Sequence, residues 1–187
     1  MKPLRGPVFA REDYAGFMRR TVAVCIDALI LLAIDYALGE ALLNFAPDSW
    51  FTEDGYLSSQ VAIVYHFSFW PMSILYLFGF RLSINGTPGY RIIRIRYAYA
   101  LGEKPPLLSI AYRAAVAVFL LWFFALDHIW ILFDPHKQAW HDKVSGFYVV
   151  KRRAKPHGTQ LMNRRLINFM MLTFPVWEPA RVQQNPT

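Results

Sequence analysis

Arg20 and Asp27 are the charged residues whose types and spacing are best suited to chemistry in this sequence. Seven residues apart at the start of an apolar run, they would lie on nearly the same face of a helix, about 10 Å apart along its axis. A carboxylate inside a membrane is costly, so Asp27 must face protein or water and hold a partner or a proton. Two interpretations follow: Asp27 binds an ion or proton, or it is a buried polar lock that fixes helix packing.

Asp35 and His66 form a second pair of candidates. Asp35 lies eight residues beyond Asp27, and its expected partner is His66 in a later apolar run. The imidazole of His66 could titrate near neutral pH. A histidine that only satisfies a hydrogen bond is the more common case, and both interpretations stay open here.

A basic loop follows the second apolar run, from Arg81 to Arg96. Its Asn-Gly and Pro-Gly dipeptides are turn formers, so the backbone is expected to double back sharply at the membrane surface. Backbone N–H groups near Arg91 and Arg94 could hold a lipid phosphate or another anion. The alternative is that these bases only set the orientation of the chain in the membrane.

The segment from Phe133 to Arg153 gathers two histidines and two aspartates: Asp134, His136, His141 and Asp142. A metal site would need a recognised ligand spacing, but there is no HExxH motif and no cysteine partner, so no metal is expected. Asp142 has basic neighbours in the sequence and is expected to pair with Arg20 or Arg91 at the cytoplasmic face.

No pattern of a soluble enzyme is present in the 187 residues. The sequence lacks a Walker loop, GxGxxG, GxSxG and a haem attachment motif, so we expect no enzyme activity and no cofactor. It is 55% hydrophobic and only 18% charged, and the charged fraction is below that of typical soluble domains. The net charge is +7, and the basic residues lie beside the apolar runs. This arrangement sets membrane orientation and does not indicate a nucleic-acid partner.

Three long apolar runs must position these residues. The first, from Thr21 to Phe45, and the second, from about Leu57 to Phe80, are each long enough for a transmembrane helix. The third, from about Leu107 to Phe133, carries Arg113 near its start. A shorter run from Leu161 to Trp177 has two adjacent arginines beside apolar residues and predicts an amphipathic helix at the membrane surface.

The charges between the runs predict orientation. Residues 1–20 hold five bases and two acids, residues 44–60 hold three acids and no base, and residues 81–109 hold five bases and one acid. The positive-inside rule therefore puts the N-terminus and the 81–109 loop in the cytoplasm. Residues 134–165 hold eight bases and two acids, so both flanks of the third run favour the cytoplasm. A re-entrant hairpin would satisfy both flanks, and a third full span is the alternative.

Two short segments predict a β pair. The segments Tyr90–Tyr99 and Gly146–Val150 are rich in β-branched and aromatic residues with partial alternation. They could pair only if both lie on one side of the membrane, which favours the re-entrant hairpin.

The stretch from Tyr14 to Asp27, YAGFMRRTVAVCID, resembles the start of the RDD family of bacterial membrane proteins. Arg20 and Asp27 match that family's arginine and first aspartate, and Asp142 in AWHDKVSG matches the second aspartate. The stretch NGTPGYRIIRIR resembles the family's Gly-Gln-Thr-Pro-Gly-Lys sequence. The resemblance implies a multi-pass inner-membrane domain that is often linked to transport, with sodium/proton exchange suggested for some members.

The chain departs from the family pattern at three places. Tyr90 stands where the family usually has lysine, Asn85-Gly86 replaces Gly-Gln, and Phe147 replaces threonine. These departures favour a specialised or degenerate member of the family.

Together these features predict an α-helical integral membrane protein of the bacterial inner membrane, multi-pass, with its N-terminus in the cytoplasm. It would have two full transmembrane helices, a third membrane segment, a short cytoplasmic β pair and a C-terminal amphipathic helix. Residues 1–13 would be a cytoplasmic N-terminal segment, residues 14–153 the membrane domain, and residues 154–187 a basic linker with the amphipathic segment.

The expected function is that of a non-catalytic accessory subunit in a larger membrane protein complex. Its partners would be membrane lipids and other membrane-protein subunits or further copies of the chain. The alternative is a component of an ion or small-solute transporter, with Asp27 as the intramembrane carboxylate. The candidate residues are Arg20, Asp27 and Asp142, with Asp35, His66, Arg91, Arg113 and His141 as secondary candidates.

Overall fold

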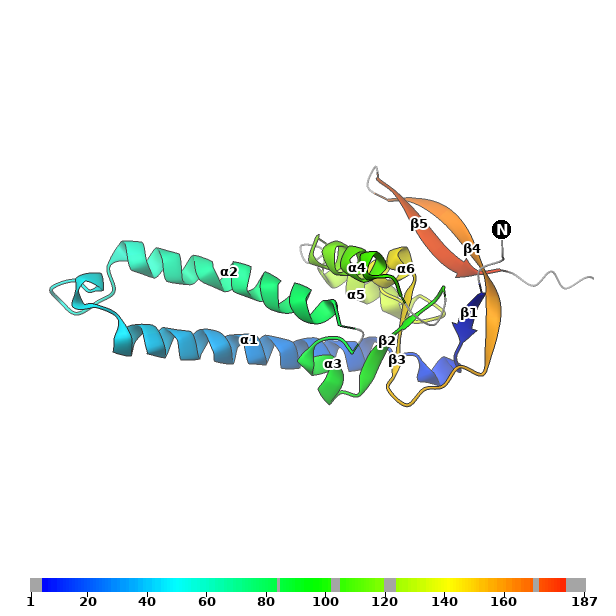
Figure 1. Ribbon diagram of the computed structural model, residues 1–187, viewed down its shortest axis with the longest axis horizontal. Coiled ribbons are helices and arrows are strands. Elements are labelled where there is room, and N and C mark those ends of the chain that lie inside the picture. The colour runs from blue at the N-terminus through cyan, green and yellow to red at the C-terminus, as the bar shows by residue number, and fades with distance from the viewer. Residues whose placement is uncertain (1–4, 84, 102–104, 120–123, 170–171, 181–187) are drawn as a thin grey trace, which may run out of the picture.

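Two long helices, α1 (Phe17–Phe45) and α2 (Ser59–Arg81), form an antiparallel hairpin that projects from the rest of the chain in the computed structural model (Figure 1). Both are long and apolar enough to cross a membrane, as the sequence predicted. Helix α1 ends just before Pro47, because proline disfavours helical backbone in the residue that precedes it. The structure describes residues 5–83, 85–101, 105–119, 124–169 and 172–180.

The apolar side chains of this hairpin are exposed on most of its sides. More than half of the surface of each of these residues is exposed: Leu29, Leu32, Val64, Phe67 and Leu75. An amphipathic helix of a soluble protein would bury one apolar stripe and expose polar residues elsewhere. The pattern seen here is that of helices surrounded by lipid or by other apolar helices.

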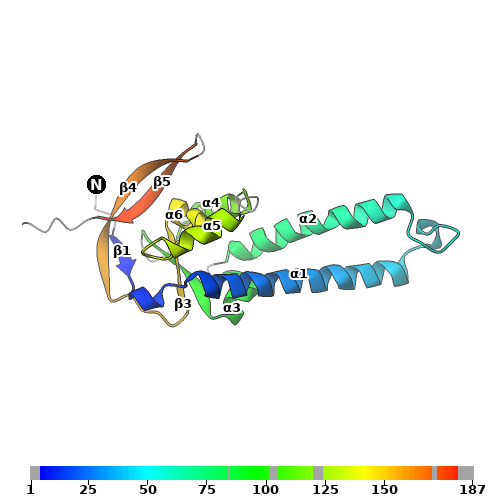
Figure 2. The same cartoon turned by 180° about the vertical axis from the view of Figure 1, so that it is seen from behind.

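Short helices gather at the base of the hairpin, on both sides of α1 (Figures 1 and 2). Helix α3 (Pro88–Ile92) packs against α1, and α4 (Leu107–Phe119) packs against α2 and α6 (Trp140–Ser145). Along the sequence, α5 (Phe124–Ile129) and a short 3-10 turn, η4 (Trp130–Leu132), come between α4 and α6. Two further 3-10 turns, η1 (Arg11–Asp13) and η2 (Asp48–Trp50), precede and follow α1 in the sequence.

The third apolar run is therefore divided between α4 and α5. The predicted turn of a re-entrant hairpin would fall at residues 120–123, which lie outside the described residues.

The predicted β pair is confirmed. Strand β2 (Ile95–Tyr99) pairs antiparallel with β3 (Phe147–Lys151), with Tyr97 opposite Val149. The predicted first strand was too long at its start, because residues 88–92 form α3. Thr87 caps this helix by accepting a hydrogen bond from the backbone N–H of Tyr90 at 3.4 Å, and proline occupies the first helical position.

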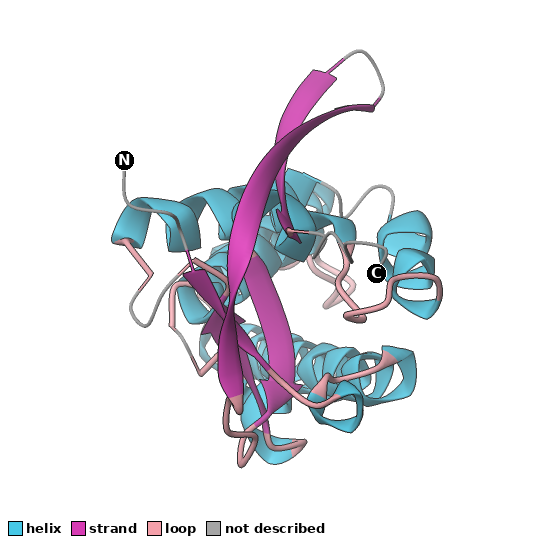
Figure 3. Cartoon of the chain, turned by 90° about the vertical axis from the view of Figure 1, so that its right-hand side faces the viewer, coloured by secondary structure: helices cyan, strands magenta, loops and turns pink. Residues whose placement is uncertain are grey.

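The predicted C-terminal amphipathic helix is wrong. Residues 158–169 and 172–179 form two antiparallel strands, β4 (Gly158–Phe169) and β5 (Leu172–Pro179), and β4 also pairs with β1 (Arg5–Val8) near the N-terminus. Figure 3 shows this twisted ribbon crossing the end of the helical part. Pairing with a distant strand outweighs local helical periodicity, and β5 accommodates Pro175 because it is an edge strand.

The buried core lies on both faces of the β2–β3 pair. One face packs Phe9, Tyr14, Ala98, Tyr148 and Val150, and so joins the pair to β1 and β4. The other face packs Ala23, Tyr90, Ile95, Tyr97 and Phe147, and so joins it to α1 and α3. This small mixed core holds the base of the hairpin and positions the charged residues described next.

Candidate functional site

Asp142 is the centre of a buried network of charged side chains. It lies on α6 and is fully buried. Its Oδ2 accepts a hydrogen bond from Arg20 Nη1 at 2.5 Å, and its Oδ1 accepts two from Arg113, at 2.6 Å from Nη2 and 2.9 Å from Nε. One carboxylate thus binds two arginines, which come from α1 and α4.

Arg20 ties the first residues of α1 to two other segments. Besides Asp142, its guanidinium donates to the carbonyl oxygens of Ala15 at 2.9 Å and Lys137 at 2.5 Å. Its side chain is fully buried, so each of these bonds replaces a bond to water. Of the two partners expected for Asp142, the structure selects Arg20. The other, Arg91, is exposed, and its guanidinium lies 5.8 Å from the centre of the Phe80 ring.

Arg113 is held on an aromatic surface as well as on Asp142. Its guanidinium lies over the ring of Tyr97, 3.6 Å from the centroid, and 5.6 Å from that of Phe147. Such contacts are strongest when the cation is desolvated, as it is here. The predicted third membrane segment is thereby fastened to the β2–β3 pair.

His141 connects Asp142 to a second carboxylate. Its Nδ1 lies 2.7 Å from Asp127 Oδ2 on α5, and its Nε2 lies 3.2 Å from Asp142 Oδ1. Burial lowers the pKa of His141, but the adjacent carboxylates of Asp127 and Asp142 outweigh burial and raise this pKa above its ordinary value. Burial alone would raise the pKa of Asp142, yet His141, Arg113 and Arg20 hold it well below its ordinary value. Within the network, the carboxylates favour the charged form of His141, and the cations favour the charged form of Asp142.

Asp27 lies two turns further along α1 and belongs to a separate contact. Its Oδ1 accepts hydrogen bonds from the backbone N–H of Gly89 at 2.8 Å and from the hydroxyl of Tyr76 at 3.1 Å. The side chain faces α3 and is almost fully buried. Arg20 and Asp27 thus share one side of the helix, as their spacing predicted, but they hold different segments.

Gly89 is a glycine because α3 approaches α1 so closely. A Cβ atom at this position would overlap the backbone carbonyl of Ala23 and come within 3.0 Å of Asp27 Cγ. The Thr-Pro-Gly stretch therefore has three roles: Thr87 caps α3, Pro88 begins it, and Gly89 permits contact with Asp27.

The remaining candidates lie outside the network. Asp35 and His66 were expected to pair, but no ion pair joins them among the described residues. Instead, the backbone carbonyl of Asp35 accepts a hydrogen bond from Tyr65 at 2.9 Å, and a ring nitrogen of His66 lies 2.9 Å from the carbonyl oxygen of Ala62 on its own helix. His66 is exposed.

Sequence reasoning did not select Asp127 or Asp134 as site residues. Asp134 orders the loop before α6, because it accepts bonds from the backbone N–H groups of His136 at 2.9 Å and Gln138 at 3.2 Å and from Lys143 at 2.6 Å. Two adjacent ionisable residues inside an apolar run, Asp127 and His128, could have indicated Asp127. Among the described residues, no group of three or more His, Cys, Asp or Glu side chains is arranged to hold a metal ion.

The comparison with known families gives a match to most of the chain. The model of the RDD family matches residues 14–146, which include Arg20, Asp27, Gly89 and Asp142. Searches of curated proteins and of solved structures gave no match.

Proposed function

The chain belongs to the RDD family, and from this and the geometry of its charged residues we propose that it is a non-catalytic accessory subunit of a larger membrane protein complex. The observation that carries the proposal is that both aspartates in the family's positions, Asp27 and Asp142, connect separate segments of the chain by hydrogen bonds. Asp142 binds two arginines and Asp27 binds the start of α3. Removal of one partner from a buried ion pair is strongly destabilising, so Asp142 in particular has a structural role.

The depth of Asp27 supports the same conclusion. Eighteen residues separate Asp27 from Phe45 at the end of α1, a rise of roughly 27 Å. This is close to the thickness of the hydrocarbon core, about 30 Å. Asp27 then lies near the inner boundary of the bilayer, where a structural carboxylate is less costly than at its centre.

The exposed hairpin supports a role in assembly. Few residues in the most apolar part of α1, and none in that of α2, are fully buried within the chain. Van der Waals packing between helices requires closely fitting neighbours. Lipids and other membrane subunits, or further copies of the chain, are the partners that this surface fits.

For orientation, we propose an inner-membrane protein with its N-terminus in the cytoplasm and both ends of residues 107–133 on that same side. Arg113 and Asp127 both contact α6, at neighbouring residues. In one continuous helix these two residues would be roughly 21 Å apart. A re-entrant path therefore fits better than a third full span.

The orientation predicts which cysteines react with a reagent that does not cross the membrane. With the exposed Cys25 replaced by serine, a cysteine introduced at Gly158 should stay unlabelled in intact cells, and one at Thr52 in the outer loop should be labelled. Labelling at Gly158 would contradict the re-entrant path.

A transporter component is the second candidate, and one feature of Asp27 favours it. Both hydrogen bonds to its carboxylate end on Oδ1, and no described residue donates to Oδ2. This oxygen could hold an ion or a proton. With two candidate spans, the chain would need further subunits to enclose a pathway.

The Asp27→Asn substitution separates the two functions. If the chain is an accessory subunit, wild-type protein in proteoliposomes should show no cation flux above empty vesicles, and the variant should co-purify less partner protein because α3 is less firmly held. Glu40→Gln, an exposed change on the same helix, is the matched control and should leave partner recovery unchanged. Flux that the variant loses while it keeps its partners would overturn the accessory role.

A further inference from the structure

Arg81, the last residue of α2, carries a cation without a partner among the described residues. Its Nε and Nη1 atoms are buried, and its side chain makes no hydrogen bond or ion pair with any described residue. An unsatisfied buried donor costs free energy, and the cost is larger when the group is charged. An anion from outside the chain would remove this cost.

Arg91 places a second cation at the same end of α2. It lies on α3, it is exposed, and its guanidinium is 5.8 Å from the centre of the ring of Phe80, the residue next to Arg81. No described acidic residue forms an ion pair with Arg91. The next residue, Ile92, is exposed although it is apolar. An arginine beside an exposed apolar residue suits a segment at the membrane surface.

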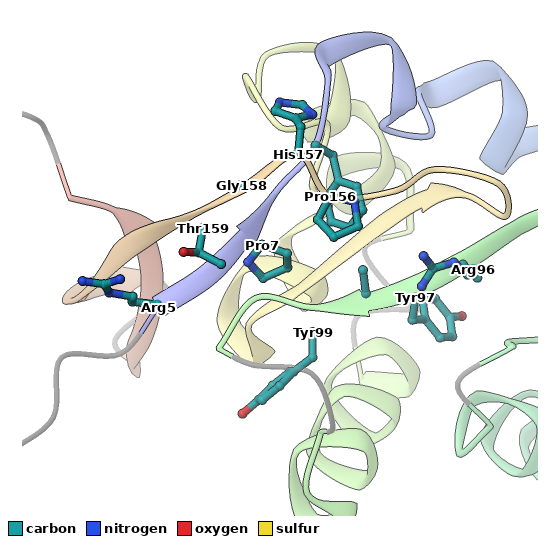
Figure 4. A pocket seen from close by; sticks show the side chains of 11 residues that line it. Arg5, Pro7, Arg96, Tyr97, Tyr99, Pro156, His157, Gly158 and Thr159 are labelled. Atoms are coloured by element: carbon teal, nitrogen blue, oxygen red, sulfur yellow. The ribbon is translucent and has the colours of Figure 1, made fainter.

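Arg96, from the same basic loop, differs because its guanidinium is already engaged. Its Nε and Nη2 donate to the backbone carbonyls of Arg152 at 3.3 Å and Ala154 at 3.1 Å. Figure 4 shows Arg96 beside Tyr97 on β2, in the lining of a groove that also includes Pro156. Its cation is thus used within the chain, in contrast to the two at the end of α2.

The depth of Arg81 is that of the lipid headgroups. The hydroxyl of Tyr76 donates to Asp27, which lies near the inner boundary of the bilayer in the orientation proposed above. Arg81 follows Tyr76 by five residues, a rise of roughly 7.5 Å toward the cytoplasm. The headgroup layer is roughly 5–7 Å thick on each side of the bilayer. Because helical side chains lean toward the N-terminus of their helix, Arg81 points back toward the hydrocarbon core, where lipid phosphates are the nearest anions.

An exposed apolar face of α2 continues from Arg81 into the bilayer. Ile74 and Phe67 precede Arg81 by seven and fourteen residues, which places them on nearly the same side of the helix. Trp70 lies between them in the sequence, and all three side chains are exposed. This face suits an acyl chain below a headgroup that Arg81 binds, whereas a free phosphate or a soluble acidic peptide would use none of it.

We propose that Arg81 and Arg91 bind the phosphate of an anionic phospholipid in the cytoplasmic leaflet. One of its acyl chains then lies along the face formed by Ile74, Trp70 and Phe67. Guanidinium groups suit phosphate because they donate two parallel hydrogen bonds to its oxygens. A negatively charged headgroup adds attraction, about fivefold in affinity for each base at the surface. The inference rests on the membrane orientation proposed above and does not depend on the accessory role.

Lipid titration of the purified full-length protein tests the site. Native mass spectrometry in a neutral detergent measures the affinity for dioleoyl phosphatidylglycerol. The double variant Arg81→Gln, Arg91→Gln should bind this lipid about 25-fold more weakly. The matched double variant Arg11→Gln, Arg153→Gln, which removes two exposed bases outside α2 and α3, should bind it as the wild type does. Equal weakening in both double variants, or wild-type affinity in the first, would overturn the proposal.

The single variant Arg91→Gln keeps the test valid if the double variant does not fold. This side chain is exposed, so its replacement should leave the unfolding temperature unchanged and weaken lipid binding by about fivefold. Unaltered lipid binding by the folded variant would contradict the site.

A photoreactive phosphatidylglycerol locates the bound lipid. With a diazirine in its acyl chain, it should label residues 67–74 of α2, and excess unlabelled phosphatidylglycerol should suppress the labelling. The same concentration of phosphatidylcholine, or of inorganic phosphate, should not suppress it. Suppression by phosphatidylcholine would show no preference for an anionic lipid, and suppression by inorganic phosphate would show a free-anion site. Either result, or labelling only outside residues 67–74, would overturn the proposal.

A partner subunit that covers this face is the competing occupant. In native membranes, p-benzoylphenylalanine at Ile74 should give no crosslinked protein, and a protein captured there would overturn the lipid assignment while supporting the accessory role. Labelling of Gly158 from outside would overturn the orientation and, with it, the assignment to the cytoplasmic leaflet. If the orientation holds and the double variant Arg81→Gln, Arg91→Gln binds lipid like the wild type, this inference alone fails.

Discussion

The Asp142→Asn variant is expected to lose about 3–5 kcal/mol of folding stability, enough to prevent accumulation of most marginally stable proteins. Asparagine has almost the same volume, so the loss comes from charge. Arg20 and Arg113 would remain fully buried without the carboxylate that they share. Thermal unfolding of the purified protein in detergent micelles measures the effect. Asp54→Asn, in the exposed loop between α1 and α2, is the matched control and should unfold like the wild type.

A double variant shows whether the loss arises from the unpaired charge. Adding Arg113→Gln to Asp142→Asn removes one of the two orphaned cations. The double variant should therefore lose less stability than the sum of the two single variants, because the three residues form one network. If Asp142→Asn unfolds at the wild-type temperature, the buried network does not hold the base of the hairpin together.

The Gly89→Ala variant is expected to lose about 3 kcal/mol, the second large effect. The added methyl group would meet the backbone carbonyl of Ala23, which belongs to a continuous helix and cannot move aside. Helix α3 would have to shift, and the hydrogen bond from Gly89 to Asp27 would lengthen or break. Unfolding temperature in micelles measures the loss, and hydrogen exchange at the Gly89 amide locates it.

Gly79→Ala is the control for this substitution. Gly79 lies inside α2, and apart from the adjacent backbone of its own helix, no atom of the described residues lies within 4 Å of where its Cβ would be. Alanine is also the better helix former, so this change should leave stability unchanged or raise it slightly. Equal effects at Gly79 and Gly89 would show that the close approach of α3 to α1 is not required.

Local signals in the sequence were reliable where one segment decides its own structure. The spans of α1 and α2 follow from the length of their apolar runs. The Asn-Gly and Pro-Gly dipeptides indicated a change of direction after α2, and the structure has the short helix α3 there. The β2–β3 pair was predictable because each segment has β-forming residues and their alternation matches one buried pair. The C-terminal segment was misread because its apolar residues fit a helix about as well as a strand.

The sequence by itself determined that the chain has two apolar helices, a basic loop between the second and third apolar runs, and an arginine and aspartates in the family positions. Tertiary structure decided which charges meet. Asp142 pairs with Arg113, 29 residues away, and with Arg20, 122 residues away. It also decided that residues 158–161 form a strand, because they pair with Arg5–Val8 at the other end of the chain. Local propensity acts within a few residues, whereas ion pairs and strand pairs depend on contacts that exist only once the whole chain has folded.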